Sequence, residues 1–165
     1  YTQDTVYLSE RRGLEAICTH RALGDFPIKA LTLDVGIRRP LGVGAGGLAI
    51  LAALPESESE AIIAANSQRY ARFANFDVAF LRGEVQAARA RGYSFLDSAA
   101  TPGAAAVGVA FPSSAGSRPI AALSVAAISS RLSGPRLGEV AQAMQQQLQQ
   151  VNQLLAAKLR RTAGE

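Results

Sequence analysis

Residues 38–54 read RRPLGVGAGGLAILAAL, a passage of small residues that leads directly into an apolar run. The apolar part, residues 48–54, predicts a short helix that ends before Pro55, because proline cannot continue a helix. The glycines also satisfy the G-x-G-x-x-G spacing of a dinucleotide site. Such a site needs a strand running straight into the first glycine and an acidic residue about 20 positions further on. Here Arg-Arg-Pro precedes that glycine, and the residues around Ile62 are expected to be helical, so the spacing does not predict a dinucleotide site.

A different property of the same passage points to an anion. The first N–H groups of a helix have no acceptor within the helix, and they lie at the positive end of its dipole. Ala45, Gly46 and Gly47 lead into the expected helix and carry at most a methyl group over these N–H groups. They are therefore candidate binders of a carboxylate. The alternative is that glycine permits close packing of the helix on a sheet, and the sequence leaves both interpretations open.

The chain before this passage predicts three strands. Residues 5–9 and 14–21 are expected to form a β-hairpin with a turn at residues 10–13. Residues 28–33, IKALTL, alternate apolar and polar side chains, as in a half-buried strand.

The chain after this passage predicts two further helices. Ser57 and Glu60 have the spacing of a capping box, which predicts a helix from Ser57 to about residue 73. Asp77 can cap the next helix, which is expected to run to Arg91 and to end at Gly92.

Strands and a long helix are expected to complete the chain. The strands cover residues 93–96, 104–111 and 119–128, with a polar turn at residues 113–118. They are rich in alanine, a poor strand former whose small side chain leaves room for something else to pack on the sheet. Residues 135–161 place apolar side chains at three- and four-residue steps, as one face of a helix does: Leu137, Val140, Ala141, Met144, Leu148, Val151, Leu155 and Leu159.

The order of strands, helices, strands and helix predicts an α+β fold with a mostly antiparallel sheet. The composition, 48% hydrophobic and 18% charged, is that of a globular domain, and we expect one domain over residues 1–165. The longest apolar stretch, residues 41–54, is shorter than the roughly 20 residues of a membrane span. Residues 1–10 contain no basic side chain, so no signal peptide is expected and a cytoplasmic location is the default.

The charged and reactive residues give little support for nucleic-acid binding or catalysis. The net charge is +4, but the basic residues are scattered and no DNA-binding motif organises them. Cys18 is the only cysteine and His20 the only histidine, which removes most catalytic triads and any histidine-rich metal site. The two would share a face of one strand, yet Cys18 is interpreted as a small buried hydrophobe. No enzyme activity, metal or cofactor is expected.

Three blocks of sequence, in order, resemble the C-terminal domain of the IclR family of bacterial transcription regulators. The first is VGIRRPL at residues 35–41, followed by the small-residue passage and AILA at residues 49–52. It is similar to the family's G-x-R-x-P-L and A-x-G-K-A-x-L-A segment, although Leu48 stands where lysine is common. The second block is RARGYS at residues 89–94, and the third is PIAALSV at residues 119–125 with SRL at residues 130–132.

The resemblance implies a GAF-like α+β fold: a central antiparallel sheet with helices on its faces and a long C-terminal helix. It also implies a buried pocket for a small organic acid effector. Operator DNA would be bound only through a winged helix-turn-helix domain, which is absent from this chain. Homodimers or homotetramers are expected, and no membrane association.

The resemblance further implies which residues contact the effector. Its carboxylate would meet the backbone amides of Ala45 and Gly46, and Arg39 beside them could add a charge-assisted bond, although a surface role for Arg39 is an equal alternative. The remaining lining positions implied by the family are Ile28, Leu31, Leu96, Ala106, Ser124 and Ala126.

Three of these positions depart from the pattern for small polar acids. Leu96, Ala106 and Ala126 stand where an acidic residue, a cysteine and a serine are better known. The departure predicts an aromatic or otherwise hydrophobic carboxylate as effector, because polar groups of a ligand would stay unpaired there. The alternative function is a ligand-independent oligomerisation module of the regulator.

Overall fold

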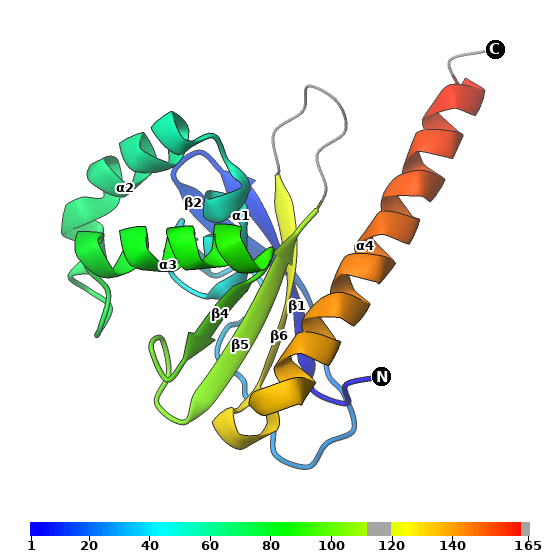
Figure 1. The fold of residues 1–165 in the computed structure, drawn as a ribbon, viewed down its shortest axis with the longest axis horizontal. Coiled ribbons are helices and arrows are strands. Elements are labelled where there is room, and N and C mark those ends of the chain that lie inside the picture. The colour runs from blue at the N-terminus through cyan, green and yellow to red at the C-terminus, as the bar shows by residue number, and fades with distance from the viewer. Residues whose placement is uncertain (112–119, 163–165) are drawn as a thin grey trace.

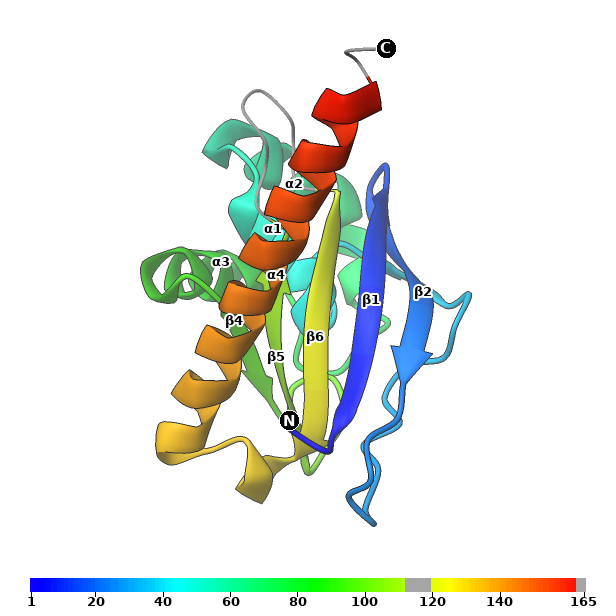
Figure 2. The ribbon, with the colours of Figure 1, turned by 90° about the vertical axis from the view of Figure 1, so that its right-hand side faces the viewer.

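A computed structural model describes residues 1–111 and 120–162, with side chains as far as residue 158. Its six-stranded sheet has the order β3-β2-β1-β6-β5-β4, and every neighbouring pair is antiparallel. Helices α1, α2 and α3 cover one face of the sheet, and α4 crosses the other (Figures 1 and 2). The predicted α+β architecture, with its central antiparallel sheet and long C-terminal helix, is therefore confirmed.

The first hairpin consists of β1 (Thr5–Arg12) and β2 (Glu15–Ala22). The turn expected at residues 10–13 is wrong, because β1 continues to Arg12, which pairs with Glu15. Only two residues remain for the loop, and Gly13 supplies the positive φ, 63°, that such a tight hairpin needs.

The strand predicted at residues 28–33 is also wrong. Residues 23–37 form an irregular stretch, here called the connecting segment, and the edge strand is β3 (Arg38–Pro40). β3 takes the free edge of β2 by pairing with residues 15–17. Burial does not follow the alternation that suggested a strand: Ala30 is buried and Leu33 partly buried on the sheet, while Ile28 and Leu31 are exposed.

Helices α1 and α2 begin without a side-chain cap, whereas α3 begins with one. α1 (Ala45–Ala53) begins inside the small-residue passage, three residues before the expected Leu48. α2 (Glu56–Tyr70) begins after Pro55, whose carbonyl accepts bonds from Glu58 N and Ser59 N. The capping box at Ser57 is therefore wrong. α3 (Val78–Arg91) has the predicted ends: Asp77 accepts a 2.7 Å bond from Phe80 N, and Gly92 is left-handed.

The second half of the sheet is β4 (Ser94–Asp97), β5 (Ala104–Ala110) and β6 (Ala121–Ile128), followed by the 3₁₀ turn η1 (Ser129–Arg131). The predicted turn at residues 113–118 and Pro119 lie outside the described residues. α4 (Gly134–Thr162) packs its apolar stripe on the outer face of β5 and β6, with these residues buried: Val140, Ala141, Met144 and Leu148. Val151, Leu154 and Leu155 continue the helix beyond that contact and are exposed. No helix within the described ranges is long and apolar enough to span a membrane.

Cys18 and His20 do not share a face of β2, contrary to expectation. A β-bulge shifts the register between Leu8 and Ser9, so Ser9 is opposite Cys18 while Leu8 is opposite His20. Cys18 is buried against Tyr7 and Ala126, whereas the side chain of His20 is exposed.

Burial raises the pKa of the Cys18 thiol, so the reactive thiolate is disfavoured in the folded protein. We expect iodoacetamide at pH 8 to alkylate Cys18 at least about a hundredfold more slowly in the native protein than in urea, because the thiol must first be exposed by opening. Mass spectrometry of timed samples measures both rates. Equal rates in the two conditions would contradict the buried position.

Candidate functional site

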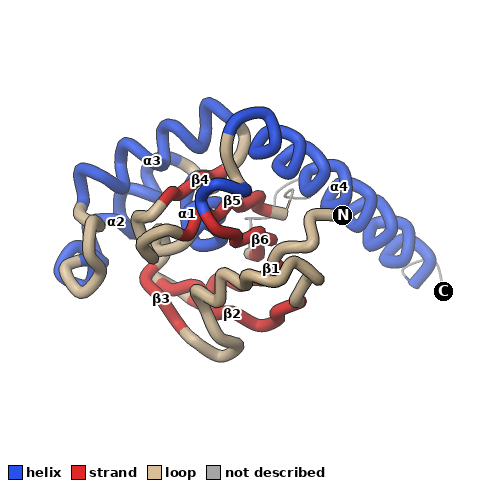
Figure 3. The backbone as a smooth tube through the Cα atoms, turned by 90° about the horizontal axis from the view of Figure 1, so that it is seen from below, coloured by secondary structure: helices blue, strands red, loops and turns tan. Residues whose placement is uncertain are grey.

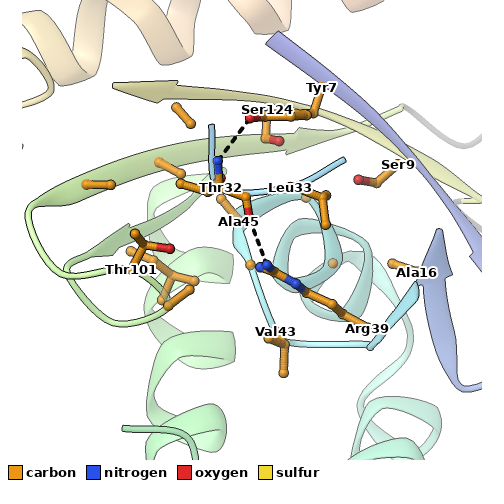
Figure 4. Close-up of a pocket in the computed structure, with 18 of the residues that line it drawn as sticks. Tyr7, Ser9, Ala16, Thr32, Leu33, Arg39, Val43, Ala45, Thr101 and Ser124 are labelled. Atoms are coloured by element: carbon orange, nitrogen blue, oxygen red, sulfur yellow. Dashed lines mark hydrogen bonds between the residues drawn. The ribbon is translucent and has the colours of Figure 1, made fainter. Parts of the chain in front are cut away.

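A cavity lies between the inner face of the sheet and the N-terminus of α1, with the connecting segment as one of its walls (Figure 4). Its free volume is about 50 Å³. The residues around it come from both halves of the sheet, from α1 and from the turn after β4. Figure 3 shows, from below, how these elements gather around the start of α1.

The N-terminus of α1 forms one end of the cavity. Gly44 precedes the helix with a φ of 86°, and the first intrahelical bond runs from Leu48 N to Gly44 O at 2.9 Å. The N–H groups of Ala45, Gly46 and Gly47 come before that donor, and all three residues line the cavity. This geometry allows the backbone to donate hydrogen bonds to an anion.

Close packing fixes this helix end against the sheet. Ser94, fully buried, donates its single hydroxyl proton to Ala45 O at 2.6 Å, and Gly108 O lies 3.3 Å from the same Oγ. A Cβ on Gly108 would lie only 2.4 Å from Ala45 O. Glycine therefore permits close packing at Gly108 on β5. The same interpretation holds within the small-residue passage at Gly46, where a Cβ would lie 3.0 Å from Ser9 Oγ.

Arg39 lies beside the same helix end. Its Nη2 donates to Thr32 O at 2.7 Å, and its Nη1 is 3.8 Å from the position that a Cβ of Gly44 would take. Burial lowers the pKa of the guanidinium, but an arginine side chain remains charged at neutral pH. Among the described residues no carboxylate forms an ion pair with Arg39. The cavity thus contains a partly buried positive charge without a counter-ion from these residues.

Two serine hydroxyls add to the polar end of the cavity. Ser9 on β1 and Ser124 on β6 are only 4% and 7% exposed, and both line the cavity. A Cβ on Gly46 would be 3.0 Å from Ser9 Oγ and 3.5 Å from Ser124 Oγ, so both hydroxyls lie next to this backbone. Neither forms a hydrogen bond with any described residue. They are free to bond a molecule at this end of the cavity.

Seven of the nine predicted site residues surround this cavity. Arg39, Ala45, Gly46 and Ser124 form its polar end, and Leu96, Ala106 and Ala126 contribute to its apolar walls. Ile28 and Leu31 do not line it; each is 56% exposed, since the segment that carries them is not a strand.

Four polar residues at the cavity were not predicted from the sequence: Tyr7, Ser9, Thr32 and Thr101. Thr5, Tyr7 and Ser9 follow one another at every second position of β1, so they share one face of the strand. This spacing could have indicated a row of inward-facing side chains. Thr32 had no such signal, because its position depends on the irregular backbone of the connecting segment. Tyr7 Oη donates to Ala30 O at 3.1 Å and accepts from Thr32 N at 3.2 Å.

An α+β domain with a polar-ended cavity at a helix N-terminus has the form of a small-molecule-binding domain. A family model described as the C-terminal part of the bacterial transcriptional regulator IclR matches residues 1–153. The chain therefore belongs to the IclR family of bacterial transcriptional regulators, as the three sequence blocks indicated.

Solved structures of such regulators share the fold. IclR of Thermotoga maritima superimposes with a TM-score of 0.81 at 22% identity, over 93% of this chain and 62% of that chain. The repressor BlcR of Agobacterium tumefaciens gives 0.75 at 23% identity, over 90% and 58%. A C-terminal domain of a regulator from Vibrio cholerae gives 0.61 at 24% identity, over 79% and 75%. The chain thus spans about three fifths of the first two proteins, and no curated protein matches it.

Proposed function

We propose that this chain is the effector-sensing part of a transcription regulator and that its cavity binds an organic carboxylate. Binding would change the affinity for operator DNA of a DNA-binding domain elsewhere in the full-length protein. The observation that supports this most directly is the charge of Arg39, partly buried beside three free helix N–H groups and without a described acidic partner. A carboxylate at this point would satisfy all of these donors at once.

The size and lining of the cavity favour a compact acid with an apolar body. A volume of about 50 Å³ is room for roughly three to five water molecules. Leu96, Ala106 and Ala126 would contact the apolar part, while Ser9 and Ser124 could bond an oxygen near the carboxylate. An aromatic acid, the type predicted from the sequence, requires a larger cavity than this structure has.

We expect Arg39→Met to weaken binding of such acids by about ten- to a hundredfold, the value of one charge-assisted hydrogen bond. The measurement is a thermal-shift titration of the protein with small aliphatic and aromatic acids, with calorimetry on those that bind. An acid at about 100 times its dissociation constant adds about 2.7 kcal/mol to the stability of the folded protein.

Arg82→Met is the matched control, because Arg82 pairs with Glu60 on the surface and is not at the cavity. It should bind the same acids with unchanged affinity. If an acid binds wild type and Arg39→Met with equal affinity, its carboxylate does not bind Arg39, which contradicts the proposed site. The absence of a shift with any acid would remove the proposed sensing function.

A second function, oligomerisation without a ligand, has one observation in its favour. The apolar stripe of α4 continues past the sheet, and Val151, Leu154 and Leu155 are exposed there. A homodimer or homotetramer formed through this part of α4 would cover them. Analytical sedimentation of wild type and Leu154→Glu separates the two functions. Oligomerisation alone is favoured if wild type forms a stable oligomer that no acid changes and Leu154→Glu is a monomer.

A further inference from the structure

Backbone hydrogen bonds join the connecting segment to the rest of the molecule near its two ends. At one end Gly24 N donates to Asp4 O at 3.1 Å and Phe26 N to Gln3 O at 2.9 Å. At the other end Gly36 N donates to Cys18 O at 2.8 Å. Its outer face carries the exposed side chains of Ile28 and Leu31.

Its middle is held by a few polar contacts and by the packing of Ala30 and Leu33 on the sheet. Tyr7 Oη bonds both Ala30 O and Thr32 N, Arg39 Nη2 bonds Thr32 O, and Arg21 pairs with Asp34, which is exposed. Figure 4 shows Tyr7 and Arg39 reaching Thr32 from opposite sides. A stretch with so few bonds to its surroundings is expected to open locally more readily than the sheet.

Arg39 contacts both this segment and the proposed carboxylate position. One arm of its planar guanidinium, Nη2, is used by Thr32 O. Nη1, directed to the start of α1, and Nε form no bond with a described residue. A guanidinium can donate through both edges at once, so a carboxylate can bind Nη1 without displacing Thr32 O.

We propose that Arg39 is the bridge by which an effector locks the connecting segment over the cavity. The inference rests on the proposed function, since it requires an acid at the start of α1. With the carboxylate bound to one arm, the guanidinium is held in place, and its bond to Thr32 O becomes harder to break. Opening of the segment then requires release of the acid, so the effector has different affinities for the closed and open forms. Arg39 therefore acts on the segment as a positioning residue.

The test is hydrogen exchange followed by mass spectrometry on peptides covering residues 27–35, with benzoate and, in parallel, isobutyrate. Each protein is compared with and without acid, at about 100 times its own measured dissociation constant. In wild type the acid should slow exchange in these peptides by at least about tenfold. The upper limit is about a hundredfold, because at this concentration about one molecule in a hundred is free of acid.

Two variants separate bridging from binding. Arg39→Lys keeps a positive charge but has no second planar arm, so it should still bind benzoate while slowing exchange in residues 27–35 by less than about twofold. Tyr7→Phe removes the hydrogen bond between Thr32 N and Tyr7 Oη and leaves the bond from Arg39 to Thr32 O intact. Its exchange should be faster in both states, but the ratio between them should remain that of wild type.

The outcomes distinguish the two proposals. If neither benzoate nor isobutyrate raises the unfolding midpoint of wild type, the bridge is overturned. If no acid in the thermal-shift titration raises it, the sensing function fails as well. If an acid binds and exchange in residues 27–35 is unchanged, or if Arg39→Lys retains the full slowing, the bridge alone is overturned.

Discussion

Replacing Gly108 by alanine is expected to lower the free energy of unfolding by about 3 kcal/mol, because the added Cβ has no space. It would lie 2.4 Å from Ala45 O and 2.7 Å from Ala45 C, and these are backbone atoms that no rotamer change can move. Helix α1 must shift away from β5, and the bond from Ser94 to Ala45 O is strained with it. Urea unfolding followed by circular dichroism measures the loss. Because Ala45 begins the proposed carboxylate site, binding of acids should weaken in the same variant.

Gly138→Ala provides the matched control. Gly138 lies inside α4, and a Cβ there would meet no atom within 4 Å. Alanine has the higher helix propensity, so this variant should be more stable by about 0.5–1 kcal/mol. If Gly108→Ala were as stable as wild type, α1 would not be packed on β5 as described.

Asp4→Asn is expected to lower the free energy of unfolding by about 2 kcal/mol. The Asp4 carboxylate is 1% exposed and accepts from Arg131 Nε at 2.8 Å and from Arg136 Nη2 at 3.1 Å. The amide keeps the shape but removes the negative charge that both guanidinium groups share. Removing one partner of a fully buried ion pair costs about 3–5 kcal/mol, and we expect a smaller loss here because both arginines are partly exposed. Arg131 also lies over the ring of Phe26, so this cluster joins the start of β1, the connecting segment and η1.

Asp34→Asn tests whether the loss of stability expected for Asp4→Asn depends on burial of the ion pair. Asp34 pairs with Arg21, but its side chain is 75% exposed, and exposed pairs contribute about 0–1 kcal/mol. Denaturation of the two variants under the same conditions should therefore separate them clearly. Equal losses would show that the surroundings of Asp4 do not matter.

Much of the fold was predictable because its signals are local. The Asp77 cap and the Gly92 stop define α3 without reference to the rest of the chain. The apolar period of α4 gives the helix its extent, since the buried positions repeat with the helical turn. The small-residue passage indicated a helix N-terminus that could receive an anion, and this is where the cavity lies.

What could not be predicted depends on contacts between distant residues. The alternation of residues 28–33 is compatible with a strand, but the edge of β2 is taken by Arg38–Pro40, so the segment has no partner to pair with. A bulge in the register of β1 and β2 separates Cys18 from His20, and nothing in the sequence marks it. Ser9 and Thr32 reach the cavity from elements far apart along the chain, which only the folded sheet brings together.

The two ends of the sheet limit how copies of this domain can aggregate or assemble. The outermost strands are β3, with three residues, and β4, with four. A proline without an N–H and an exposed Arg38 occupy the β3 edge, so little backbone is free there to template an incoming strand. Growth of the sheet from molecule to molecule, the route to fibres, is therefore disfavoured at that border. Association through helix faces, such as the exposed end of α4, is not limited in this way.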